Sequence, residues 1–115
     1  MNEMMKKTNK KIVIENNYGV KIEFVGRKIG SGTNYAKGDK HWDKVEIYRS
    51  EDRIYVGVCT FVEYRKVKDI TVHISKSEDD LFMLMTLQWT RISGYIKDAF
   101  IKAGLKFVEA WESDQ

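Results

Sequence analysis

The stretch of residues 77–103 constrains the fold of this chain more than any other segment. It reads SEDDLFMLMTLQWTRISGYIKDAFIKA. Ser77 is a typical helix N-cap, three acidic residues follow it, and Gly104 stands where a C-cap glycine is expected. Apolar residues recur at helical spacing and form one broad face: Leu81, Leu84, Met85, Trp89, Ile92, Tyr95, Ile96, Ala99 and Ala103. The sequence therefore predicts one long helix within 77–103.

Most of the chain before residue 77 alternates between apolar and polar residues as β-strands do. The predicted strands are 11–15, 20–25, 44–50, 53–64 and 70–76, and the first two form a hairpin. The strand 53–64 carries apolar side chains on both faces, which indicates a central place in the sheet. We expect an α+β fold, in which an antiparallel sheet of about five strands is covered by one long helix from the C-terminal half.

A chain of 115 residues predicts a single domain, 1–115. Residues 1–10 are polar and are expected to be flexible. Residues 26–43 read GRKIGSGTNYAKGDKHWD, with four glycines, and predict a long Gly-rich loop. Residues 105–115 suit either a last edge strand or a short second helix.

Composition points to a cytoplasmic protein. The single cysteine excludes an internal disulfide, and no apolar run follows the lysine-rich start as a secretory signal would require. The longest apolar-rich run, 81–89, is too short to cross a membrane. The net charge is +3, but residues 1–44 hold ten Lys and Arg against five Asp and Glu. This asymmetry favours an anionic partner, or it reflects an ordinary solvated surface.

Basic and aromatic residues mix in and around the predicted loop. Lysines bind phosphates and aromatic rings stack on unpaired bases, so this composition is typical of a nucleic-acid surface. The candidates are Arg27, Lys28, Tyr35, Lys37, Lys40, His41, Trp42 and Lys44, extended by Arg65, Lys66 and Lys68 if the two turns share an end of the sheet. Gly30 and Gly32 do not start a nucleotide-binding loop, because no third glycine and no helix pattern follow.

Cys59 and His73 are a pair of the kind that can act as a nucleophile and its base. Cys59 lies between Gly57 and Phe61 on an apolar face, where cysteine usually serves as a small inert hydrophobe. With His41 these residues show no metal-ligand spacing. We therefore expect no enzyme activity, no metal and no cofactor.

The side of the predicted helix that faces away from the core is also apolar. We interpret Met83, Leu87, Thr90 and Gly94 as a protein interface, for another protein or for a homodimer. Two alternatives remain open. Residues 105–115 fold back over this side, or Gly94 breaks the helix and redirects it.

The chain is Lys- and Ile-rich, begins MNEMMKKTNKK, has no proline and combines a sheet with a helix. In these features it is similar in kind to the small anti-CRISPR inhibitors that phages and plasmids encode. The resemblance implies a protein that binds a bacterial defence effector, such as a CRISPR RNA-guided nuclease or its guide RNA. The charge of +3 argues against mimicry of DNA phosphates. We expect a non-catalytic binding protein of this kind; the alternative is a nucleic-acid-binding accessory protein that uses the loop 26–44.

Overall fold

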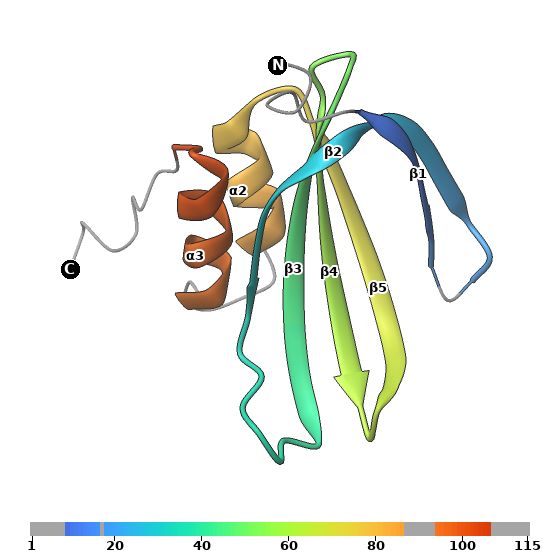
Figure 1. The fold of residues 1–115 in the computed structure, drawn as a ribbon, viewed down its shortest axis with the longest axis vertical. Helices are drawn as coiled ribbons and strands as arrows, with labels where there is room; N and C mark the ends of the chain where they lie inside the picture. Colours follow the sequence, from blue (N-terminus) through green and yellow to red (C-terminus); the bar gives the residue numbers. More distant parts are fainter. Residues whose placement is uncertain (1–8, 17, 87–93, 107–115) are drawn as a thin grey trace, which may run out of the picture.

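The computed structural model describes residues 9–16, 18–86 and 94–106, which form one curled antiparallel sheet with two helices beside it (Figure 1). In chain order the elements are β1 (Lys10–Glu15), β2 (Lys21–Thr33), β3 (His41–Ser50), β4 (Tyr55–Glu63), β5 (Lys66–Ser75), α2 (Glu78–Thr86) and α3 (Gly94–Ala103). Each strand pairs with the next along the chain. The predicted α+β class and antiparallel five-stranded sheet are confirmed.

The prediction of a long loop over 26–43 is wrong. β2 continues to Thr33 and β3 begins at His41, so the connection spans only residues 34–40. β2 passes the glycine-rich stretch with a bulge between Lys28 and Gly30. Glycine usually weakens a strand, so its presence here needs a packing reason.

That reason is the backbone of α3, which lies directly against β2. A Cβ atom at Gly32 would stand 2.0 Å from the carbonyl oxygen of Tyr95. One at Gly30 would stand 2.3 Å from the carbonyl oxygen of Ala99. Only glycine lets a helix approach a strand so closely.

The structure has two short helices where the sequence predicted one long helix, so that part of the prediction is corrected. α2 covers β4 and β5, whereas α3 covers β2 and β3. The helices lie side by side and run in opposite directions (Figure 1). A helix is about 10 Å across and strands are spaced about 4.8 Å apart, so two helices cover more of a five-stranded sheet than one. Neither described helix has the length and apolar composition needed to cross a membrane.

Both predicted helix caps are present. The backbone N–H of Asp80 donates a 3.0 Å hydrogen bond to Oγ of Ser77. Gly104 has φ +73°, and Leu105 N–H donates to the Phe100 carbonyl at 3.0 Å, which is the pattern of a Schellman C-cap. The sequence signals at the two ends were therefore correct, although they belong to different helices.

The hydrophobic core lies between the helices and one face of the sheet. Phe82 of α2 and Phe100 of α3 meet edge to face, with ring centroids 5.0 Å apart. When residues 77–103 are treated as one helix, neither ring falls on the apolar face predicted from the sequence. Leu84 does fall on that face, but its side chain is 36% exposed in the structure. Trp89 and Ile92 lie outside the described residues. The other buried core residues are Val45, Ile47, Tyr55, Leu81, Met85, Tyr95, Ile96 and Ala99.

The opposite face of the sheet, here called the open face, is covered only in part. The β1–β2 hairpin curls over one end of it, where the rings of Phe24 and Tyr48 lie 5.8 Å apart. Between this hairpin and the sheet is a hollow of about 280 Å³, lined by residues that include Ile14, Val58 and Ile70. Toward the other end of the open face, Tyr64 and Val67 are 62% and 51% exposed.

We predict that Gly32→Ala lowers the free energy of unfolding by about 1–3 kcal/mol, because the new methyl group would overlap the backbone of α3. Urea denaturation monitored by circular dichroism measures this change. The matched control is Gly94→Ala, at the start of α3, where a Cβ atom would have no neighbour within 4 Å among the described residues. Equal stability of the two variants would contradict the packing argument.

Candidate nucleic-acid interface

The loop 34–40 and the β4–β5 turn meet at one end of the sheet, at the bottom of Figure 1. The backbone N–H of Tyr64 in the turn donates a 2.7 Å hydrogen bond to the carbonyl of Lys40 in the loop. Between them lies a groove of about 950 Å³, here called the basic groove. It is lined by Tyr35, Lys37, Gly38, Asp39, Lys40, Trp42, Lys44, Val62, Tyr64, Arg65 and Val67.

Hydrogen bonds hold the loop wall of the groove in shape. The side-chain oxygen of Asn34 accepts from the backbone N–H of Asp43 at 2.7 Å, which ties the loop to β3. Asp39 N–H donates to the Ala36 carbonyl at 2.9 Å, and Gly38 between them has φ +92°, as the third position of a type II turn requires. The lysines of this loop therefore project from an organised backbone.

The turn wall has an unusual backbone. Glu63 and Lys66 pair across it, so Tyr64 and Arg65 form a two-residue hairpin turn. Their φ angles are +52° and +68°, a conformation that such turns normally fill with Asn or Gly. Keeping a bulky residue there costs roughly 1–2 kcal/mol each. Strain of this size at a groove is a common mark of function.

The groove has an apolar floor and exposed aromatic walls. Val45 belongs to the core, so Trp42 and Lys44 on the same strand alternate with it and face the open side. Trp42 pairs with buried Val62 on β4. Its ring lies 5.0 Å from that of Tyr35, edge to face. Tyr35 is 50% exposed, so its ring is held in place while much of it still faces solvent.

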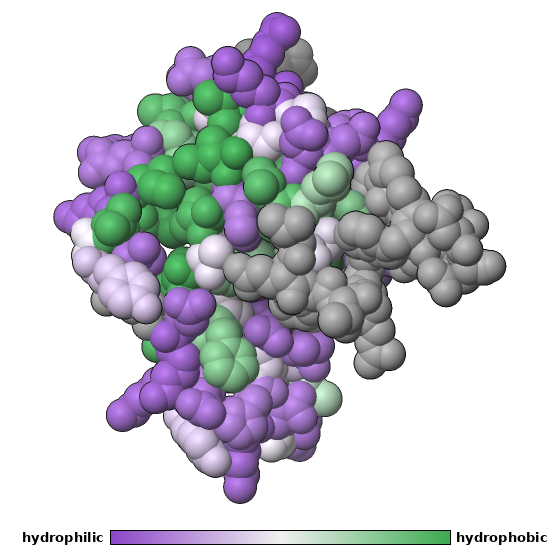
Figure 2. Space-filling view, turned by 180° about the vertical axis from the view of Figure 1, so that it is seen from behind, coloured by the Kyte–Doolittle hydropathy of each residue, from purple (hydrophilic) through white to green (hydrophobic). Residues whose placement is uncertain are grey.

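Positive charge surrounds this floor. The lining includes four basic side chains, Lys37, Lys40, Lys44 and Arg65, and one acidic side chain, Asp39. Within the described ranges no carboxylate lies within 4 Å of any of the four cations. Figure 2 shows that hydrophilic side chains cover most of this lower end of the molecule, whereas hydrophobic side chains gather higher up. The groove therefore attracts anions with charges that are not already neutralised by described neighbours.

Six of the residues predicted from the sequence converge on the groove: Tyr35, Lys37, Lys40, Trp42, Lys44 and Arg65. The condition that the two turns share an end of the sheet is met. The other five candidates do not line it. Arg27 and Lys28 lie within β2, and Lys28 forms a 2.9 Å ion pair with Glu46. His41 and Lys68 lie 3.1 and 3.8 Å from carboxylate oxygens of Glu63. Lys66 follows the turn and is exposed.

Sequence reasoning did not single out five lining residues: Gly38 and Asp39, which lie within the predicted loop, and Val62, Tyr64 and Val67. Tyr64 directly precedes the basic run Arg65-Lys66, and an aromatic residue in such a turn was a usable signal. The two valines gave no signal, because the alternation of the predicted strand 53–64 already explained Val62, and Val67 lay between two predicted strands.

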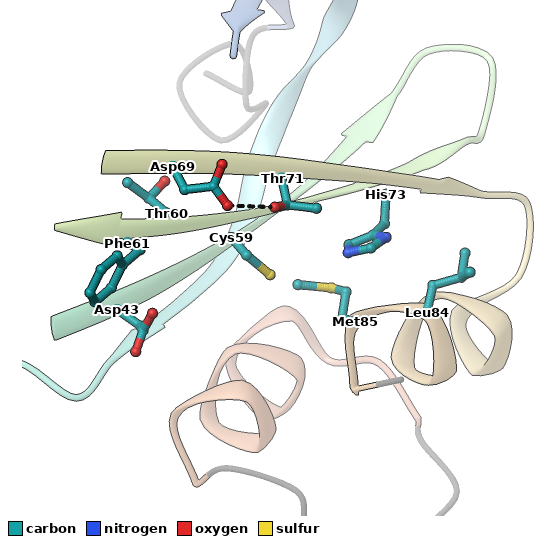
Figure 3. A pocket seen from close by; sticks show the side chains of 9 residues that line it. All are labelled: Asp43, Cys59, Thr60, Phe61, Asp69, Thr71, His73, Leu84 and Met85. Atoms are coloured by element: carbon teal, nitrogen blue, oxygen red, sulfur yellow. Dashed lines mark hydrogen bonds between the residues drawn. The ribbon is translucent and has the colours of Figure 1, made fainter. Parts of the chain in front are cut away.

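Cys59 lines a separate small cavity of about 140 Å³ between the sheet and α2 (Figure 3). Its sulfur points toward the side chain of Met85. His73 pairs with Gly57, so it lies one step diagonally from Cys59. Burial first, and then the nearby charge of Asp43, raise the pKa of the thiol to about 11. Cys59 is therefore a protonated thiol at neutral pH, which does not favour a role as nucleophile.

The predicted protein interface does not form one continuous line. Met83 on α2 is 53% exposed, and Gly94 is exposed at the start of α3. Because they belong to two different helices, these two residues do not share a helix face. Leu87 and Thr90 lie outside the described residues. A homodimer through this surface stays a prediction.

Comparison with protein-family models, with curated proteins and with solved structures gives no match for this chain. In the part of the chain that the structure describes, no three His, Cys, Asp or Glu side chains gather as metal ligands would. The argument for function therefore depends on the groove itself.

We predict that Cys59 reacts slowly with iodoacetamide in the folded protein, with a half-maximal rate near pH 11 instead of the ordinary pH 9. Because the folded-state pKa is raised, the contribution of this thiol to stability is complete below pH 9 and is lost as the pH rises toward 11. Alkylation rates measured by mass spectrometry in buffer and in urea test this. A half-maximal rate near pH 9 in the folded protein would contradict it.

We predict that the double replacement Tyr64→Asn, Arg65→Gly raises the free energy of unfolding by about 1 kcal/mol, because both new residues tolerate positive φ. Urea denaturation measures the change. Arg53→Gly is the control, since Arg53 also has positive φ, +65°, but does not line the basic groove. A loss of stability in the double variant would show that the native side chains contribute more than the backbone strain costs.

Proposed function

We propose that this protein is a non-catalytic nucleic-acid-binding protein and that the basic groove is its binding site. The observation that carries the proposal is the convergence of Tyr35, Trp42 and Tyr64 with four basic side chains around one groove. Cations supply sequence-independent attraction to phosphates, and aromatic rings supply contacts to bases.

The energetics favour an anionic polymer over a single small anion. The basic side chains stand on the loop, on β3 and on the turn, so they are spread around the groove and do not converge on one point. A polymer with regularly spaced phosphates neutralises several of them together and releases counterions from each phosphate.

The inhibitor role implied by the resemblance to anti-CRISPR proteins stays a prediction. It is compatible with the same site, because a guide RNA exposed on an effector nuclease offers phosphates and unpaired bases to the basic groove. In that case the partner would be a protein–RNA complex, and binding would depend on the RNA.

We predict that replacing Lys37, Lys40 and Lys44 together with Gln weakens binding to a fluorescent oligonucleotide at least tenfold in low salt. The slope of log affinity against log salt should also fall by up to about 2, since each phosphate contact on a single strand contributes about 0.7. Fluorescence anisotropy across a salt series measures both quantities.

The control is Lys10, Lys21 and Lys76 changed to Gln, which alters the net charge equally at exposed positions that do not line the groove. The proposal expects affinity and salt slope close to those of the parent protein. If both triple variants bind alike, attraction comes from overall charge and the groove is not the site. If the parent protein binds no oligonucleotide at low salt, the proposed function is wrong.

A further inference from the structure

We infer that the basic groove selects single-stranded over double-stranded nucleic acid, with Tyr35 and Tyr64 as two base-stacking platforms. This inference rests on the proposed function and concerns the form of nucleic acid that fits. The reasoning begins from the distribution of polarity across the groove.

The floor of the groove is apolar and its rim is charged. Val62 is 6% exposed, Trp42 is half-buried beside it, and Val67 adds a further apolar side chain. A duplex keeps its base faces stacked inside and presents phosphates to its surroundings, so it gains little from such a floor. A single strand can turn its bases toward the floor and leave its phosphates at the cationic rim.

The two tyrosines stand on opposite walls and are largely uncovered. Tyr35 on the loop is 50% exposed and Tyr64 on the turn is 62% exposed. The walls are joined beneath them by the hydrogen bond between Tyr64 N–H and the Lys40 carbonyl. This hydrogen bond joins the backbones of the two walls that carry the rings.

Each platform is also held individually. Tyr35 N–H donates to Oγ1 of Thr33 at 3.0 Å, and its ring packs against Trp42. The ring of Tyr64 lies 5.1 Å from that of His41, edge to face, on a backbone locked in the left-handed region. Rings that are already ordered lose little entropy when a base stacks on them, which strengthens binding.

Fluorescence anisotropy with the full chain tests the inference with three probes of about 12 nucleotides, a length within the site sizes of single-strand-binding folds. They are an oligothymidylate, a duplex of equal length, and an abasic strand that keeps the phosphates without the bases. The oligothymidylate should bind at least tenfold more tightly than either of the others at the same salt. The abasic strand should match the duplex, because both lack accessible base faces.

Variants assign the preference to the two rings. Tyr35→Ala and Tyr64→Ala should each weaken oligothymidylate binding about tenfold and leave duplex binding unchanged, whereas Tyr64→Phe should retain the parent affinity. Tyr18→Ala is the matched control, because Tyr18 is 84% exposed and does not line the groove. Circular dichroism checks that each variant is folded. If Tyr64→Ala unfolds, the comparison of Tyr64→Phe with the parent protein and the result with the abasic probe still test the inference.

The outcomes separate this inference from the proposed function. Equal affinity for the oligothymidylate and the duplex, with both lost in the triple lysine variant, would overturn the single-strand inference and leave nucleic-acid binding intact. Tight binding of the abasic strand would also overturn it. If polyglutamate binds the groove as tightly as the oligothymidylate does, the site is a cationic surface for acidic proteins, and the inference and the proposed function both fail.

Discussion

The close contact between two helices and glycines of the sheet is the constraint on which the rest of the structure depends. α3 rests on Gly30 and Gly32 of β2, and α2 rests on Gly57 of β4, where a Cβ atom would stand 2.4 Å from the sulfur of Met85. The two helices therefore cover the part of one sheet face against which they pack, over β2 to β5. Any polar surface that the strands present must therefore lie on the open face or beyond the ends of the helices.

The basic groove lies at that remaining place. β3 alternates between Val45, which faces the core, and Lys44, which faces the groove, so neighbouring residues of a single strand contribute to the core and to the groove lining. The loop 34–40 extends past the helices, and Asn34 and Asp43 tie it back to the sheet. Packing on one face thus determines where the charged side chains of the other face are presented.

Local signals in the sequence predicted much of the fold. Alternation located all five strands, and Ser77 and Gly104 located the outer ends of the helical region. The prediction of a loop over the glycine-rich stretch failed because glycine is typical both of loops and of strands that pack closely against a helix. Only the position of α3 distinguishes these two cases. The split into two helices was missed for a similar reason. Caps and periodicity are local signals, and they do not show how much of the sheet the helical region has to cover.

The groove was predicted in part because charge and aromaticity are visible in the sequence, whereas backbone conformation is not. Six lining residues were found from composition. Tyr64 was not, because its position in the turn depends on a positive φ that is uncommon for tyrosine. A turn built from Asn and Gly would close the same hairpin with less strain. The chain instead keeps an aromatic ring and a guanidinium at the rim of a groove whose described cations have no described carboxylate within ion-pair distance. The backbone strain of the turn opposes folding, and it occurs at the same end of the sheet as these cations. Under the proposed function, a bound anion would pair with these cations and a stacked base would use the ring that the strained turn presents, so binding would account for the strain.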